Sequence, residues 1–140
     1  MIKIIYWSGT GNTKAMAECI EQGVKAIGKA VELKEVDQVT HADVEEAEVL
    51  VLGCPSMGDE VLEESEMEPF VESLEGRVSD KKVALFGSYG WGNGEWMDDW
   101  KDRMNGYGVD MVVEPLIVNE TPTGEDEAVC MEFGQTIASC

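Results

Sequence analysis

Short apolar runs alternate along this chain with longer segments of helical period, and this alternation constrains the fold more than any other feature. The runs that we expect to be strands span residues 2–7, 31–36, 49–54, 83–88 and 109–119, the last with a break near Pro115. Strands separated by helices pair in parallel, because parallel neighbours need long crossover connections. The pattern therefore predicts an α/β protein with a doubly wound, five-stranded parallel sheet and helices on both faces.

Helical segments carry their own boundary signals. Ser65, followed three residues later by Glu68, predicts a capping box at the start of the helix after the third strand. In the last helix we expect a buried stripe at Val129, Phe133 and Ile137. Residues 39–46 carry a weak pattern, which fits a short helix or a loop.

Length and charge limit the possible functions. The chain has 140 residues, 44% of them apolar, which suits one domain over residues 1–140 with one core. Ten Lys and Arg against 29 Asp and Glu give a formal charge of −19. This field repels nucleic acids and anionic lipids and attracts proteins with basic faces, so we expect neither nucleic acid nor membrane as a partner.

Cysteine and histidine usage gives no indication of a metal site. Cys19, Cys54, Cys130 and Cys140 lie far apart in the sequence, and His41 is the only histidine. We expect four free thiols in a reducing compartment. The apolar start of the chain is too short for a signal peptide, and no run approaches the ~18 apolar residues of a membrane span, so we expect a cytoplasmic protein.

The loop after the first strand is the clearest candidate site. Its residues are Ser8, Gly9, Thr10, Gly11, Asn12 and Thr13. Glycines, hydroxyl groups and a helix N-terminus together favour an anion-binding cradle. The pattern matches neither the phosphate loop of nucleoside-triphosphate enzymes nor the glycine fingerprint for dinucleotides. A simple turn with Asn12 or Thr13 as the helix N-cap is the alternative.

Two further loops follow strands three and four, at residues 54–60 and 88–94. Trp91 lies between glycines on a loop, where a large aromatic side chain is unusual unless something covers it. Met57 and Trp91 could enclose a flat aromatic ligand between them. Alternatively, Tyr89 and Trp91 fold back onto the core.

Catalytic groups are hard to find, because no convincing pair of nucleophile and base is present. Between Asp59 and Glu75 the chain holds eight acidic residues and no Lys or Arg. Such a run is often only a solvated face, but this one begins inside the candidate site. The sequence therefore favours binding or electron transfer over catalysis.

The three loops together resemble those of flavodoxins, of the short-chain type found in clostridia and related anaerobes. The resemblance covers essentially the whole chain. The segments 85–92 and 57–60 are the most diagnostic, and the last strand lacks the inserted loop of long-chain members.

The resemblance implies the flavodoxin-like strand order 2-1-3-4-5 and a non-covalent FMN. It also implies low-potential transfer of single electrons between redox proteins, with the flavin moving between neutral semiquinone and hydroquinone. The residues that it implies for the FMN site are Ser8, Gly9, Thr10, Gly11, Asn12, Thr13, Pro55, Ser56, Met57, Gly58, Asp59, Glu60, Ser88, Tyr89, Gly90, Trp91, Gly92 and Asn119.

Individual roles follow from the same resemblance. It implies that the first loop holds the phosphate and that Met57 and Trp91 cover the two faces of the ring. It also implies that the Gly58 carbonyl accepts a hydrogen bond from the reduced ring and that Glu60 accepts one from the N3–H group. Pro55 stands where some relatives have a small hydroxyl residue.

The implied partners are redox proteins with basic docking faces, such as a pyruvate oxidoreductase, a ferredoxin-NADP reductase or a hydrogenase, and the implied state is a monomer. The main alternative is a flavin-dependent NAD(P)H:quinone or FMN reductase of the same fold. A second alternative is a phosphate-binding module without redox function.

Overall fold

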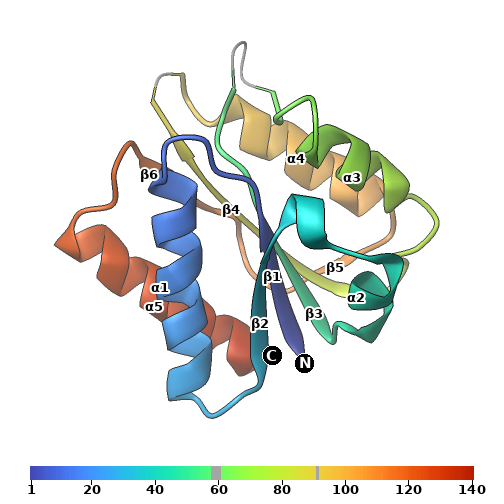
Figure 1. The fold of residues 1–140 in the computed structure, drawn as a ribbon, viewed down its shortest axis with the longest axis horizontal. Coiled ribbons are helices and arrows are strands. Elements are labelled where there is room, and N and C mark those ends of the chain that lie inside the picture. Colours follow the sequence, from blue (N-terminus) through green and yellow to red (C-terminus); the bar gives the residue numbers. More distant parts are fainter. Residues whose placement is uncertain (58–60, 91) are drawn as a thin grey trace.

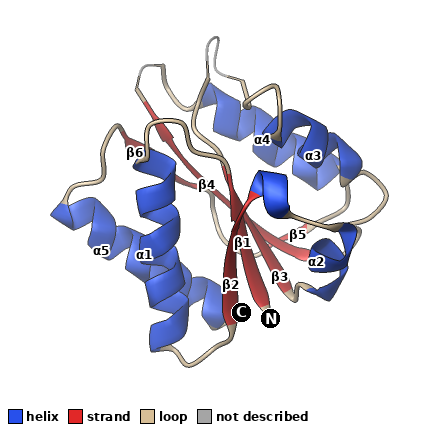
Figure 2. Ribbon diagram, in the orientation of Figure 1, coloured by secondary structure: helices blue, strands red, loops and turns tan. Residues whose placement is uncertain are grey.

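A parallel sheet forms the centre of the molecule in this computed structural model, which describes residues 1–57, 61–90 and 92–140 (Figures 1 and 2). The strands are β1 (Ile2–Tyr6), β2 (Val31–Glu35), β3 (Val49–Gly53), β4 (Lys82–Tyr89), β5 (Asp110–Met111) and β6 (Leu116–Asn119). Their order is β2-β1-β3-β4-β5, with β6 also paired to β4. All of these pairings are parallel, which confirms the predicted fold class and strand order.

Helices cover both faces of the sheet. They are α1 (Asn12–Ala26), the 3-10 turn η1 (Val36–Gln38), α2 (His41–Glu46), α3 (Met67–Ser73), α4 (Glu95–Gly106) and α5 (Gly124–Ala138). In Figure 1, α1 and α5 lie side by side on one face, and α3 and α4 lie on the other. Two apolar layers match this arrangement, one packed against α1 and α5 and the other against α2, α3 and α4.

The last strand differs most from expectation. We expected one strand over 109–119 with a break near Pro115, and the structure has two short pieces instead. β5 pairs with Lys82 and Val83 at the start of β4, and β6 pairs with the end of β4 from Phe86 to Tyr89. The residues between the pieces include Pro115, which has no N–H group to donate to a neighbouring strand.

The start of α3 also differs from expectation, because the predicted capping box of Ser65 and Glu68 is wrong. The residue before α3 is Glu66, and no side-chain bond from this N-cap residue to the helix is found among the described residues. Instead, the carboxylate of Glu63 accepts hydrogen bonds from three backbone N–H groups at this end. Glu68 points elsewhere and forms a two-pronged ion pair with Arg103 of α4.

The predicted stripe of α5 is correct at Phe133 and Ile137 but wrong at Val129, which is 46% exposed. Cys130, the next residue, is buried in its place.

α1 and α5 also approach closely, since a Cβ atom added at Gly23 or Gly134 would collide with the backbone of the opposite helix. In the described ranges, none of the helices combines the length and hydropathy that a membrane crossing requires.

Candidate FMN site

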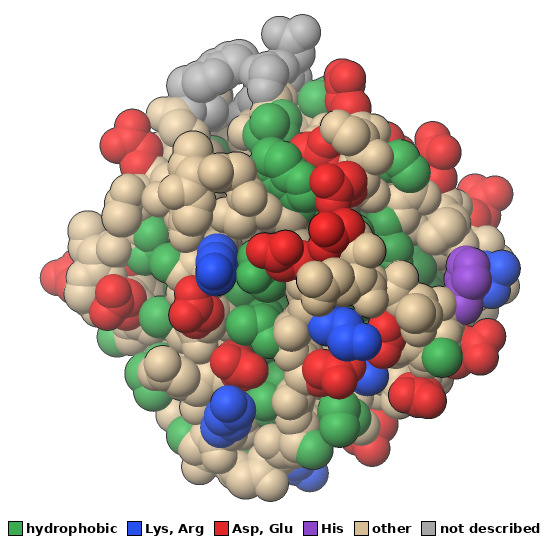
Figure 3. Space-filling model, viewed as in Figure 1, with side chains coloured by type: hydrophobic (Ala, Val, Ile, Leu, Met, Phe, Trp, Pro, Cys, Tyr) green, Lys and Arg blue, Asp and Glu red, His purple; other side chains and the backbone are tan. Residues whose placement is uncertain are grey.

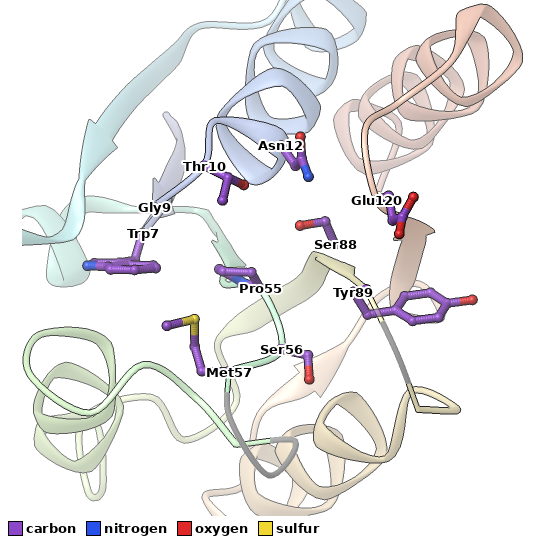
Figure 4. A pocket seen from close by; sticks show the side chains of 11 residues that line it. Trp7, Gly9, Thr10, Asn12, Pro55, Ser56, Met57, Ser88, Tyr89 and Glu120 are labelled. Atoms are coloured by element: carbon purple, nitrogen blue, oxygen red, sulfur yellow. The ribbon is translucent and has the colours of Figure 1, made fainter.

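A hollow of about 250 Å³ opens where β1, β3 and β4 end (Figure 4). Ligands of open α/β sheets bind at this edge, beside the point where the strand order reverses. Here β1 lies between β2 and β3, so the reversal falls next to the loop that follows β1. The residues lining the hollow are Trp7, Gly9, Thr10, Asn12, Pro55, Ser56, Met57, Ser88, Tyr89, Gly90 and Glu120.

The first rim of the hollow is the loop between β1 and α1. Gly11 lies just before the helix at φ 97°, a left-handed conformation that favours glycine. The Ser8 hydroxyl accepts hydrogen bonds from the N–H groups of Gly11 (3.1 Å) and Lys14 (3.3 Å). By helix geometry, the N–H groups of Asn12 and Thr13 have no acceptor within the helix. The loop therefore presents backbone donors and the positive end of the helix dipole to an anion.

A buried hydrogen bond connects this loop to β4. The hydroxyl groups of Thr13 and Ser88 lie 3.0 Å apart, and both residues are at least 95% buried. Asn12 is held from another direction, because its Oδ1 atom accepts a hydrogen bond from Thr121 at 3.1 Å. The first turn of α1 is thus tied both to the sheet and to the segment that leads into α5.

The opposite side of the hollow is apolar. In Figure 4, Trp7 and Met57 lie together on one side, and Tyr89 lies across from them. Tyr89 also packs against the buried Trp96, with ring centroids 5.9 Å apart. It is half-buried, so it contributes both to the core and to the pocket wall.

The loop after β3 is closed by two hydrogen bonds. Met57 and Val61 each donate a backbone N–H to the other's carbonyl oxygen at 3.0 Å. Ser56 N–H donates to Ser88 O at 2.9 Å, which joins this loop to β4. Burial raises the pKa of the Cys54 thiol to about 12. This thiol is therefore a protonated packing group rather than a reactive one.

Half of the sequence-predicted residues line the hollow; they are Gly9, Thr10, Asn12, Pro55, Ser56, Met57, Ser88, Tyr89 and Gly90. Other predicted residues lie close by in the chain but outside the lining, namely Ser8, Gly11, Thr13, Gly92 and Asn119. The remaining predicted residues, Gly58, Asp59, Glu60 and Trp91, lie outside the described part of the chain.

Two lining residues were missed from the sequence. Trp7 was assigned to the end of the first strand, but β1 ends at Tyr6 and Trp7 lies in the hollow. An aromatic residue directly before the anion-binding loop was a usable signal. Asn119 lies outside the lining, and its amide donates to Tyr89 O at 3.4 Å, so its contact with the ligand stays a prediction. The next residue, Glu120, lines the hollow. Glu120 has φ 57°, which is unusual for a residue other than glycine and turns the chain sharply after β6.

These features fit FMN, which combines an anionic phosphate, a hydroxylated chain and a flat aromatic ring. The helix end offers donors for the phosphate, and Thr10, Asn12, Ser56 and Ser88 are polar groups along the hollow. Trp7, Met57 and Tyr89 offer apolar surface to a ring. Fold and site together define the class: a doubly wound α/β protein with a flavin-type pocket at the switch point of its sheet.

Comparison with known proteins identifies the family. The Flavodoxin family model matches residues 4–134. The chain is 54% identical over 138 residues to the flavodoxin of Clostridium beijerinckii, covering 99% of both chains. It is 50% identical to that of Megasphaera elsdenii, covering 99% of this chain and 98% of the other. The solution structure of the two-electron reduced M. elsdenii flavodoxin superposes with a TM-score of 0.92 over 100% of both chains, at 48% identity.

The chain therefore belongs to the flavodoxin family, in its short-chain type. Members of this family are FMN-containing, low-potential electron carriers rather than enzymes, and they serve redox proteins. This membership confirms the predicted cofactor and decides between the carrier and the reductase of the same fold.

Proposed function

We propose that the hollow after β1, β3 and β4 holds FMN, with the phosphate at the N-terminus of α1 and the ring beside Met57. One observation carries the proposal. In a chain with a net charge of −19, the first turn of α1 contains no Asp or Glu, although it opens into the main hollow. An anion is therefore accepted at this helix end without a carboxylate in the turn itself, and the acid that lines the hollow, Glu120, belongs to the loop after β6.

The residues of the loop between β1 and α1 have different roles in binding the phosphate. Ser8 fixes the backbone, because its hydroxyl accepts the N–H groups of Gly11 and Lys14 and so leaves those of Asn12 and Thr13 for the ligand. Thr10 and Asn12 line the hollow and supply side-chain hydrogen bonds. Thr13, bonded to Ser88, holds the turn at a fixed distance from the sheet.

Met57, Trp7 and Tyr89 exclude water from the ring by offering it apolar surface. When bound, FMN supplies the low-potential one-electron chemistry of the protein. The roles predicted for Gly58, Asp59, Glu60 and Trp91 stay predictions, since these residues lie outside the described part of the chain. Together with Met57 they complete the proposed ring contacts.

The redox partners are proteins with basic docking faces, and the carrier acts as a monomer in the cytoplasm. The surface charge supports the basic docking face of the partner. Asp and Glu side chains are spread across the face shown in Figure 3, where Lys and Arg are few. Part of this charge comes from the acidic run after β3, in which Glu64, Glu66, Glu72 and Glu75 are exposed. A basic partner is therefore drawn to this protein at a rate that salt lowers.

An anaerobic reductive titration of the FMN-loaded protein, followed by visible absorbance, tests the mode of electron transfer. We expect a long-wavelength band to build up at half reduction and then to fade, since a one-electron carrier separates its two steps. Direct bleaching without that band, together with NADPH turnover by the isolated protein, would contradict the proposal.

The partner charge needs a separate measurement. We expect the rate of electron transfer to a basic redox protein to fall steeply with ionic strength, and the rate to an acidic one to rise. Equal salt dependence for both would remove the electrostatic part of the proposal.

A further inference from the structure

Glu63 is buried, whereas most of the other acids that the structure describes in the run after β3 are exposed. It is 5% exposed, whereas its neighbour Glu64 lies at the surface. The Glu63 carboxylate accepts hydrogen bonds from the N–H groups of Ser65 (2.6 Å), Glu66 (2.8 Å) and Met67 (3.0 Å). A carboxylate can accept several such bonds at once, and here they satisfy the open N-terminal end of α3.

The same residue is also tied to the end of β3. Its backbone N–H donates to Cys54 Sγ at 3.4 Å, and its carbonyl oxygen accepts from Glu68 N–H at 2.8 Å. Cys54 is fully buried, and its own carbonyl oxygen accepts from Trp96 Nε1 at 3.3 Å. Glu63 therefore fixes the point at which the chain returns from the pocket loop to the core.

That loop carries a pocket residue. Val61 lies two positions before Glu63 and exchanges two backbone hydrogen bonds of 3.0 Å with Met57, which lines the hollow. Val61 itself is 45% exposed, so side-chain packing does little to hold it. The position of the Met57–Val61 bridge thus depends on what holds the chain directly after it.

The charge on Glu63 matters for this anchoring. Burial by itself would raise the pKa of Glu63, but the hydrogen bonds from Ser65, Met67 and Glu66 outweigh burial and lower this pKa. The group is therefore an ionised acceptor at neutral pH. A glutamine in its place keeps the shape but brings an NH₂ group against backbone N–H donors, which cannot bond to it.

We infer that Glu63 is a positioning residue for FMN: by capping α3 and binding Cys54, it holds the Met57–Val61 bridge against the flavin pocket. This inference rests on the proposed placement of the ring beside Met57. It assigns the buried acid a part in setting the ring's surroundings, while the exposed acids around it contribute only charge.

Glu63→Gln and Glu64→Gln form a matched pair, since both remove one negative charge from neighbouring positions. The first readout is amide hydrogen exchange in the apoprotein, which needs no bound flavin. We expect the N–H groups of Met57 and Val61 to exchange about tenfold faster in Glu63→Gln, and at the parent rate in Glu64→Gln.

The second readout is the FMN-loaded protein. We expect Glu63→Gln to raise the Kd for FMN about tenfold and to shift the one-electron midpoint potentials relative to Glu64→Gln, because only the first variant moves the loop. If both variants share the same exchange rates and potentials and Glu63→Gln merely lowers the free energy of unfolding, Glu63 only caps α3 and the inference is overturned.

Two further variants keep the outcomes separable. If Glu63→Gln does not fold, Glu63→Asp is compared with Glu64→Asp, and a shorter carboxylate at position 63 is expected to speed exchange at Met57. Met57→Ala tests the pocket itself. If it leaves the Kd for FMN unchanged, the placement of the ring beside Met57 fails. If it weakens FMN while Glu63→Gln behaves like Glu64→Gln, only the role of Glu63 fails.

Discussion

The N-termini of α1 and α5 differ in how their free backbone N–H groups are satisfied. Both helices have 15 residues, and they pack side by side. α5 is closed by its own side chains: Thr123 and Asp126 form a capping box, and Glu125 and Glu127 add negative charge to the first turn. α1 is preceded by Gly11, which has no side chain to cap the helix, and its first turn carries no acid.

The difference indicates that α1 lacks a stabilising cap at the place where it can bind a ligand. The closed end of α5 satisfies its own donors and matches the helix dipole, which stabilises the helix. The open end of α1 leaves donors for a ligand and forgoes that stabilisation. The two ends are neighbours, joined by the hydrogen bond from Thr121 to Asn12, so their contrast comes from sequence rather than from location.

The largest loss of stability is expected at the N-terminus of α2, which is capped by a side chain that is also buried. At α2, Asp43 accepts from Thr40 N–H (2.9 Å), Lys3 Nζ (3.1 Å) and Lys34 Nζ (3.0 Å). Asp43→Asn leaves the buried Lys3 with fewer partners, and we expect a loss of about 3 kcal/mol in the free energy of unfolding at pH 7. Urea unfolding measures it, with the exposed Glu45→Gln of the same helix as control.

This effect should depend on pH in a known direction. The Thr40 backbone N–H, followed by Lys34 and Lys3, holds the pKa of Asp43 well below its usual value. A lowered pKa means that the contribution is fully present above the unfolded value of about 3.9 and is lost as the pH falls below it. The difference in stability between the parent protein and Asp43→Asn should therefore begin to shrink near pH 4 and go on shrinking as the pH falls toward the lowered pKa of Asp43. A constant difference between pH 7 and pH 3 would contradict this account.

Closing the open end should cost binding rather than stability. Asn12→Asp keeps an acceptor for Thr121 and places an acid in the first turn of α1. Repulsion of an adjacent anion costs about 2 kcal/mol, within the range of about 1 to 4 kcal/mol for a close pair of unit charges, so FMN should bind about 30-fold more weakly. The apoprotein should gain up to about 0.5 kcal/mol from the helix dipole.

Fluorescence titration with FMN and urea unfolding of the apoprotein measure these two opposite changes. Asn105→Asp, at an exposed position in α4, adds the same charge away from the hollow. If both variants weaken FMN equally, the N-terminus of α1 has no special role in binding the phosphate.

The next largest effect is expected from the hydrogen bond between Thr13 and Ser88, which joins the N-terminus of α1 to the sheet. Thr13→Val leaves the buried Ser88 hydroxyl without its partner and should cost about 1.5 kcal/mol in apoprotein stability. The double variant with Ser88→Ala should recover most of this loss, because both polar groups are then gone. FMN titration of the double variant then shows whether these hydroxyls also contact the ligand. A double variant no more stable than Thr13→Val would mean that the two groups act separately.

The smallest effect is expected at the closed end of α5. Thr123→Ala removes the side chain that accepts Asp126 N–H and should cost about 1 kcal/mol of stability. The Kd for FMN should stay unchanged, since the backbone N–H groups at this helix end bond to the helix's own capping residues and not to the ligand. Urea unfolding and FMN titration of the same sample test both statements, and a weakened FMN complex would mean that the two helix ends are coupled.

Much of the fold and part of the site could be read from the sequence, because both depend on local pattern. The apolar runs from Ile2 and Val49 become β1 and β3, whose residues are buried throughout. The order of parallel strands then brings the loops after β1, β3 and β4 to one edge, so Thr10, Met57 and Ser88 meet in one hollow as predicted. The predicted cap at Ser65 failed because the acceptor for that helix end came from earlier in the chain, at Glu63.

By itself, then, the sequence determined most of the elements, the parallel pairing of the strands and the loop that can receive a phosphate, because periodicity and glycine position act over a few residues. The order of the strands came from the family resemblance. Only the tertiary structure decided which of two adjacent glutamates is buried and which is exposed, since Cys54 and Trp96 meet there from distant segments. It also turned Trp7 into the hollow and split the last strand along β4. Burial and hydrogen-bond partners of single side chains depend on neighbours that local pattern does not contain.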